Sequence, residues 1–106
     1  MLNRNVLKWP ALRKREYEIA IFQTEHPRDQ KGYKKVYQGQ MNGENHNDVI
    51  SQVFRNFNIR DLIPKTYQGR TISSGDIVMI VDRYEKKSYY KLQSGGWAEV
   101  NRLHVC

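Results

Sequence analysis

Short apolar runs separated by polar turns fill the last third of the chain. Residues 72–82, 87–92 and 95–100 carry these runs, and their β-branched and aromatic side chains fit a pleated, half-buried surface. The segments that join them, Glu85-Lys86-Lys87 and Ser94-Gly95-Gly96, contain the residue types that reverse a chain. The pattern predicts a three-stranded antiparallel meander.

A pair of strands is predicted in the first half of the chain. Residues 17–24 place apolar side chains on both faces of an extended segment, which is typical of a covered strand. A polar loop follows over residues 26–32, and residues 33–41 alternate loosely as a second strand paired with the first. Lys34 and Lys35 suit the edge of a sheet, because their charges discourage pairing with another chain.

One amphipathic helix is predicted over about residues 48–57. Its apolar positions recur at spacings of one, three and four residues, which gives a single stripe: Val49, Ile50, Val53, Phe54 and Phe57. Asn47 is the expected N-cap, and Asn58 suits the left-handed residue that ends a helix. The stripe is expected to pack on the sheet.

Residues 59–69 are predicted to be a connecting loop, held to the core by Ile59, Leu62, Ile63 and Tyr67. Together the elements predict an α+β fold, with a small, mostly antiparallel β-sheet of about five strands and one packed amphipathic helix. The expected order along the chain is β-β-α-β-β-β.

Length and composition predict one domain. The chain has 106 residues, of which 39% are hydrophobic and 27% charged, enough for one core. We expect a basic N-terminal arm over residues 1–15 and a single domain over residues 16–106. No apolar segment approaches the roughly 20 residues of a membrane-spanning helix, and no secretory signal is evident. One cysteine, Cys106, suits a reducing cytoplasm.

The net charge of +7 is concentrated near the N-terminus. Residues 1–37 hold nine Lys and Arg against four Asp and Glu, and the arm has no acid among its cations: Arg4, Lys8, Arg13, Lys14 and Arg15. Such a segment suits phosphate, anionic lipid or an acidic protein surface, or it is a solvated terminus. Trp9 is either an anchor on a partner or interfacial surface, or it folds back on its own sheet.

The chain shows no spacing typical of catalysis or of a metal site. The three histidines lie far apart, without helical i, i+4 spacing or a cysteine pair, so neither metal nor cofactor is expected. Asp76 and Asp82 flank a strand about 20 Å long and cannot act as one acid-base pair. Asp76, after Ser73 and Gly75, is better explained by turn chemistry than by catalysis. These observations favour a binding protein over an enzyme.

Single-stranded nucleic acid is the alternative ligand. Tyrosines and Trp97 are interleaved with Lys and Arg, the combination that single-strand binders use: Lys31, Tyr33, Lys34, Lys35, Tyr37, Tyr67, Arg70, Arg83, Tyr84, Lys86, Lys87, Tyr89, Tyr90 and Lys91. Tyrosine is also common in small sheet cores and at protein interfaces, and a lone Trp97 at a strand start is more often a core anchor.

The chain resembles the YodL-like domain family. The resemblance rests on the helix end Val53-Phe54-Arg55-Asn56-Phe57-Asn58, the strand entry Ser73-Ser74-Gly75-Asp76 and the closing Gly96-Trp97-Ala98-Glu99-Val100. It covers about residues 17–105, which places the basic arm outside the shared region. The family occurs in spore-forming bacilli and on phage and plasmid proteins.

This resemblance implies a small cytoplasmic protein that alters cell shape by inhibiting the actin-like elongation proteins MreB and Mbl without catalysis. The family supplies no active-site residues to transfer. The residues expected to contact a partner are therefore chosen for charge and position: Trp9, Arg13, Lys14, Arg15, Tyr33, Lys34 and Lys35. The sequence does not indicate an oligomeric state.

Overall fold

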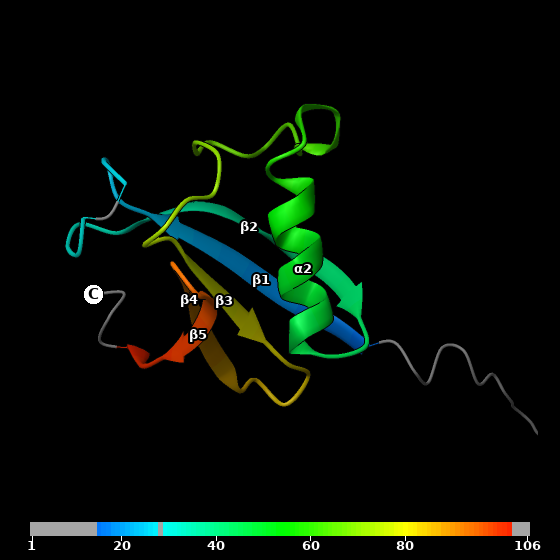
Figure 1. The fold of residues 1–106 in the computed structure, drawn as a ribbon. Coiled ribbons are helices and arrows are strands. Elements are labelled where there is room, and N and C mark those ends of the chain that lie inside the picture. Colours follow the sequence, from blue (N-terminus) through cyan, green and yellow to red (C-terminus); the bar gives the residue numbers. More distant parts are fainter. Residues whose placement is uncertain (1–14, 28, 103–106) are drawn as a thin grey trace, which may run out of the picture.

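The computed structural model describes residues 15–27 and 29–102 (Figure 1). The strands are β1 (Arg15–Gln23), β2 (Lys34–Gly43), β3 (Ile77–Val81), β4 (Lys87–Gln93) and β5 (Gly96–Val100). Helix α2 (His46–Asn56) and the short 3-10 helix η1 (Arg60–Leu62) lie between β2 and β3. The predicted α+β fold and its element order are confirmed. No helix in these ranges is long and apolar enough to cross a membrane.

The strands form one antiparallel sheet in the order β2-β1-β3-β4-β5. Local pattern predicted the β1–β2 hairpin and the β3–β5 meander. The two units form one sheet because β1 also pairs with β3, which places Ile19 opposite Ile80. β1 is therefore an inner strand, and β2 lies at an edge as its two lysines suggested.

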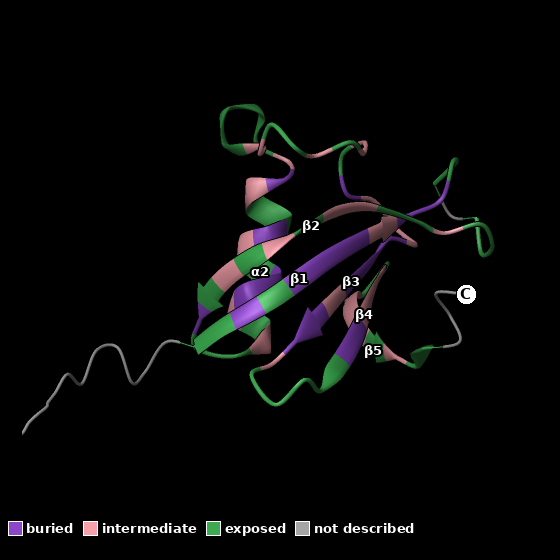
Figure 2. Cartoon of the chain, turned by 180° about the vertical axis from the view of Figure 1, so that it is seen from behind, coloured by how far each residue is buried: buried purple, intermediate pink, exposed green. Residues whose placement is uncertain are grey.

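The main core lies between α2 and one face of the sheet. Alternate residues of β1 point toward the helix, and they join residues of β3 and α2 in a single cluster that includes Tyr17, Ile19, Ile21, Val49, Ile50, Val53, Phe57, Val78 and Ile80. In Figures 1 and 2, α2 lies over the β1–β2 half of the sheet, and β4 and β5 lie to one side. Figure 2 shows the opposite face of the sheet, which no helix covers.

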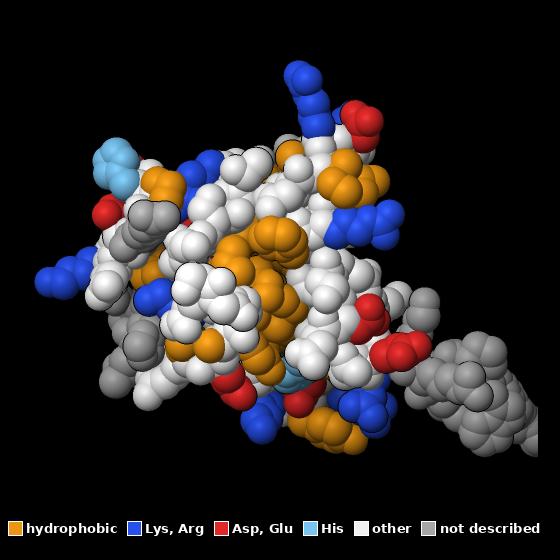
Figure 3. All heavy atoms as spheres, in the orientation of Figure 1, with side chains coloured by type: hydrophobic (Ala, Val, Ile, Leu, Met, Phe, Trp, Pro, Cys, Tyr) orange, Lys and Arg blue, Asp and Glu red, His pale blue; other side chains and the backbone are white. Residues whose placement is uncertain are grey.

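A single helix leaves part of its own side of the sheet uncovered as well. Five strands measure about 19 Å between the outer strand axes, whereas a helix with its side chains is about 10 Å wide. Leu92 and Trp97, on β4 and β5, are only partly buried, and Phe54 of α2 stands edge-on to Trp97 with ring centroids 6.4 Å apart. Figure 3 shows the resulting hydrophobic stripe along α2.

The ends of α2 differ from those predicted. The helix begins at His46, and the N-cap is Asn45 rather than Asn47, because the Asn45 Oδ1 accepts from the Asp48 N–H at 2.8 Å. Asn58 is not left-handed, since Glu85 is the one non-glycine residue with positive φ among the described residues. Its carboxamide instead brackets Ile72, accepting from the Ile72 N–H at 2.7 Å.

The connection after α2 is held differently from the expectation. Ile59 and Leu62 are 45% and 43% exposed, so their predicted role in pinning the loop is wrong. η1 interrupts the expected loop and leaves both side chains at the surface. Tyr67 does pin the segment, because its ring packs edge-on against Phe57 at 4.9 Å and lies near Tyr37 at 6.4 Å.

Two neighbouring phenylalanines test this description of the core. Phe57 is 1% exposed and Phe54 is 42% exposed. Phe57→Ala is expected to lower the free energy of unfolding by about 3–5 kcal/mol, because it empties a fully buried site. Phe54→Ala, the matched control, should cost about 1 kcal/mol, the order of one exposed aromatic contact. Urea denaturation measures both, and equal losses would contradict the placement of α2.

Candidate protein-interaction site

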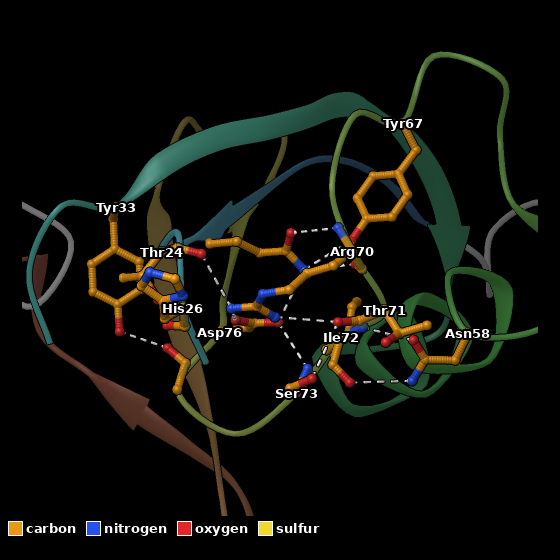
Figure 4. Close-up of polar contacts among 12 residues, drawn as sticks. Thr24, His26, Tyr33, Asn58, Tyr67, Arg70, Thr71, Ile72, Ser73 and Asp76 are labelled. Carbon is orange, nitrogen blue, oxygen red and sulfur yellow. Dashed lines mark hydrogen bonds and ion pairs between the residues drawn. The ribbon is translucent and has the colours of Figure 1, made fainter. Parts of the chain in front are cut away.

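The most concentrated polar chemistry lies where β3 begins. Asp76, the residue before β3, is fully buried and accepts two parallel bonds from the Arg70 guanidinium, at 2.9 Å from Nη1 to Oδ2 and 3.0 Å from Nη2 to Oδ1 (Figure 4). This bidentate geometry is the strongest form of an Arg–carboxylate pair. It ties the loop after η1 to the start of β3.

Gln23, the last residue of β1, completes the cluster. Its Nε2 donates to the Asp76 Oδ2 at 3.0 Å and to the Arg70 carbonyl at 2.9 Å, and its Oε1 accepts from the Arg70 N–H at 3.0 Å. The Ser73 N–H donates to the same Asp76 oxygen at 2.8 Å, as the predicted turn chemistry requires. Arg70, grouped above with a nucleic-acid face, is instead committed to this ion pair.

Two tyrosines border the cluster as hydrogen-bond donors. Burial, together with the nearby Asp76 carboxylate, raises the pKa of Tyr67 to about 12 and also raises the pKa of Tyr33. Both phenols therefore stay protonated at neutral pH. The Tyr67 hydroxyl donates to the Arg70 carbonyl, and the Tyr33 hydroxyl donates to the Gly75 carbonyl at 2.6 Å.

The other residues of the sequence motifs lie at the turns where β3 and β5 begin. Gly75 and Gly96 have φ values of 96° and 117°, which side chains rarely adopt, so both turns require glycine. The Gly75 N–H donates to the Leu92 carbonyl at 2.8 Å, which joins this turn to β4. Trp97 packs against the main core. The cluster and these turns support the fold.

A metal centre finds no support in the described residues, which contain no group of three or more His, Asp or Glu side chains able to hold an ion. A histidine and a tyrosine do meet, because the His46 Nδ1 lies 2.6 Å from the Tyr90 hydroxyl.

The helix-free face carries a hollow of about 1030 Å³, a groove that crosses four strands. Its lining mixes apolar side chains with charges of both signs; the residues that define it here are Glu16, Glu18, Lys35, Met79, Val81, Lys87 and Tyr89. We call this the open-face groove. Strand register brings these residues together: Glu18 lies opposite Val81, Met79 opposite Tyr89, and Val81 opposite Lys87.

The residues predicted to contact a partner are only partly brought together. Arg15 and Lys35 both line the open-face groove, at its two ends. Arg15 pairs with Gly43 and Phe22 with Lys35, so the two ends are seven strand residues, or about 23 Å, apart. Tyr33 is turned toward Gly75 instead. Trp9, Arg13 and Lys14 lie outside the described residues.

The middle of the groove was missed in the sequence. Glu16, Glu18, Met79 and Tyr89 were not among the predicted contact residues, although alternation places Glu16 and Glu18 on the face of β1 opposite Tyr17 and Ile19. The other groove residues come from β2, β3 and β4. They lie beside Glu16 and Glu18 only because of the strand order, which local sequence pattern does not reveal.

A five-stranded antiparallel sheet with one helix on one face and a groove on the other defines a small α+β domain. The model of the YodL-like domain matches residues 10–102, and the chain therefore belongs to this family. Residues 10–15 of the basic arm lie inside the matched region, which corrects the expectation that the whole arm lies outside it.

A curated relative agrees with this assignment. The uncharacterized protein YodL of Bacillus subtilis strain 168 is 39% identical over 89 residues, which cover 84% of this chain and 86% of the relative. The comparison with solved structures gives no match.

The buried ion pair can be tested by removing its carboxylate. Asp76→Ala is expected to lower the free energy of unfolding by about 3 kcal/mol, because Arg70 and the Ser73 and Gln23 donors lose their shared acceptor. Asp61→Ala, an exposed aspartate on η1, is the control and should change stability by less than about 0.5 kcal/mol. Equal effects in urea denaturation would show that the pair does not hold the loop.

The raised pKa of Tyr67 predicts a loss of stability at high pH. Between pH 10 and about 12 the unfolded tyrosine loses its proton while the folded one keeps it, so stability falls as pH rises through this window. Tyr67→Phe should flatten the slope of unfolding free energy against pH there, whereas Tyr84→Phe, an exposed control, should leave the slope unchanged. An unaltered slope in Tyr67→Phe would contradict the buried, protonated phenol.

Proposed function

We propose that this chain is a non-enzymatic bacterial regulatory protein that acts in the cytoplasm by contact with another protein. Its proposed effect is to modulate cell shape by inhibiting the actin-like elongation proteins MreB and Mbl. The observation that carries the contact mechanism is the open-face groove, which mixes apolar and charged side chains on the face that no helix covers. The particular partner follows from the family resemblance.

The distribution of polar groups supports binding over catalysis. The buried Asp76 carboxylate is paired with Arg70, accepts hydrogen bonds from Gln23 and Ser73, and anchors a loop. Charged side chains of both signs lie beside Met79 and Val81 in the groove, and protein interfaces combine apolar and polar groups in this way.

Charge supports a partner with an acidic surface. The net charge of +7 favours approach to negative potential. Within the groove lining the charges balance, with the cations Arg15, Lys35, Arg83 and Lys87 against the carboxylates Glu16, Glu18, Asp82 and Glu85. The proposed arm over residues 1–15, ahead of the proposed domain over residues 16–106, contributes further cations, among them Arg13 and Lys14. Such steering acts mainly on the association rate.

Single-stranded nucleic acid has weaker support. Stacking needs exposed rings, yet among the tyrosines Tyr17 and Tyr89 are buried, Tyr67 is in the core, and Tyr33 and Tyr90 are hydrogen bonded to other residues. The exposed ring is Tyr84, which the Arg83 guanidinium covers at 5.1 Å. One stacked cation and ring give a small platform.

The groove is tested by placing a charge among its apolar residues. Met79→Glu should weaken binding to purified MreB or Mbl at least tenfold and abolish the change in cell width on expression, because a carboxylate would be buried without a partner. Ile59→Glu, an apolar-to-acid change far from the groove, is the control and should act as the unchanged chain. Circular dichroism must show both variants folded.

Three results would overturn the proposal. The first is no binding to either protein by the unchanged chain, and the second is full binding by folded Met79→Glu. The third is binding to single-stranded oligonucleotide that falls steeply with added salt while MreB and Mbl do not bind, which would favour the nucleic-acid alternative.

A further inference from the structure

The sheet has two edge strands, β2 on one side and β5 on the other (Figure 1). An edge strand presents backbone N–H and C=O groups with which a further strand can pair. Folded proteins block this pairing with charges, bulges or covering loops on the edge. The two edges of this sheet differ in how far they are blocked.

β2 carries several features that block pairing. It begins with two lysines, and its register with β1 skips Val36, which makes a bulge. The Val36 carbonyl accepts from the Gln68 N–H at 3.1 Å, and the Asn42 carbonyl accepts from the Gln52 Nε2 at 2.9 Å. The connection after α2 and the helix itself therefore occupy acceptors near both ends of this edge.

β5 is open by comparison. Its five residues, Gly96–Val100, contain no Lys, Arg or Pro, and their register with β4 is unbroken. Within residues 15–27 and 29–102 its one strand partner is β4. Trp97, Ala98 and Val100 are only partly buried, so apolar side chains accompany the open edge. An apolar edge strand of this kind favours pairing with another chain.

The geometry of the sheet allows a second copy to pair with β5. Antiparallel pairing of two identical strands places a two-fold axis perpendicular to the sheet, so the helices of both copies lie on the same side. Figures 1 and 2 show α2 over the β1–β2 half, away from β5. The two helices would therefore stay apart while β5 meets β5.

One register uses the whole of β5. A pair centred on Ala98 overlaps all five residues. It places Val100 opposite Gly96 of the second copy, which has no side chain to obstruct it, and Trp97 opposite Glu99. The two Trp97 residues then lie on a diagonal about 7–8 Å long, within reach of aromatic side chains. A pair centred on Glu99 would instead place like charges directly opposite each other.

We propose that the chain forms a symmetric dimer by antiparallel pairing of β5 with β5 of a second copy, with Ala98 at the two-fold axis. The pairing adds roughly four to six backbone hydrogen bonds and covers part of the hydrophobic stripe at Trp97. Its contact area is small, so the dimer is weak and depends on concentration. No residue of β5 lines the open-face groove, so the dimer stands or fails independently of the proposed action on MreB and Mbl.

Sedimentation equilibrium of the whole chain over a range of concentrations tests the dimer. Ala98→Glu should weaken dimerisation about tenfold or more, because two carboxylates would lie directly opposite each other at the axis. Within one chain the new carboxylate lies opposite Lys91, which favours folding. Gln38→Glu, the matched control, adds the same charge to the blocked edge strand, where Gln38 already contacts Lys35, and should leave dimerisation unchanged.

A cross-link tests the register. Cys106→Ser removes the one native cysteine, and Ala98→Cys in that background should form an intermolecular disulfide on mild oxidation. Residues directly opposite on antiparallel strands have Cα atoms about 4.5–5.5 Å apart, which suits a disulfide. Gln38→Cys in the same background is the control and should stay reduced.

A chain that is monomeric at every concentration would overturn the proposal. A dimer of unchanged affinity in folded Ala98→Glu would also overturn it, as would cross-linking through Gln38→Cys as complete as through Ala98→Cys. If Ala98→Glu fails to fold by circular dichroism, hydrogen–deuterium exchange of the unchanged chain replaces it. Exchange in β5 should then slow as concentration rises, and slowing only in other segments would contradict the pairing.

Discussion

The width of the sheet relative to its one helix determines most of what this structure exposes. Five strands span about twice the width of a helix, so α2 can cover only β1, β2 and part of β3. The helix-free face is left with the open-face groove, and the β4–β5 half is left with the hydrophobic stripe beside α2. The surfaces to which we assign interactions are therefore consequences of the layer arrangement.

The Asp76 cluster makes that arrangement possible. The long connection from α2 to β3 must return to the middle of the sheet, and the Arg70–Asp76 pair with Gln23 fixes it at the ends of β1 and β3. Asn58 secures the same connection at Ile72. The charges of Asp76 and Arg70 hold the chain in this path, so their burial has a structural explanation.

The local pattern of apolar and polar residues was sufficient to predict the strands and the helix. It was insufficient to predict how these elements contact one another. Alternation predicted the hairpin and the meander, and three- and four-residue spacing predicted α2. The insertion of β1 between β2 and β3 depends on pairing far along the chain, as does the bond from Gln23 to Asp76. Arg15 and Lys35 were found in the sequence as exposed cations, but the groove between them is assembled by four strands and needed the sheet order.

Hydrogen–deuterium exchange of the whole chain with and without MreB filaments tests the central claim most directly. The account predicts slowed exchange in β1, β2, β3 and β4 and in the β3–β4 turn, the segments that form the open-face groove, with α2 unchanged. Slowed exchange confined to α2 and β5, or no change at saturating filament concentration, would contradict it.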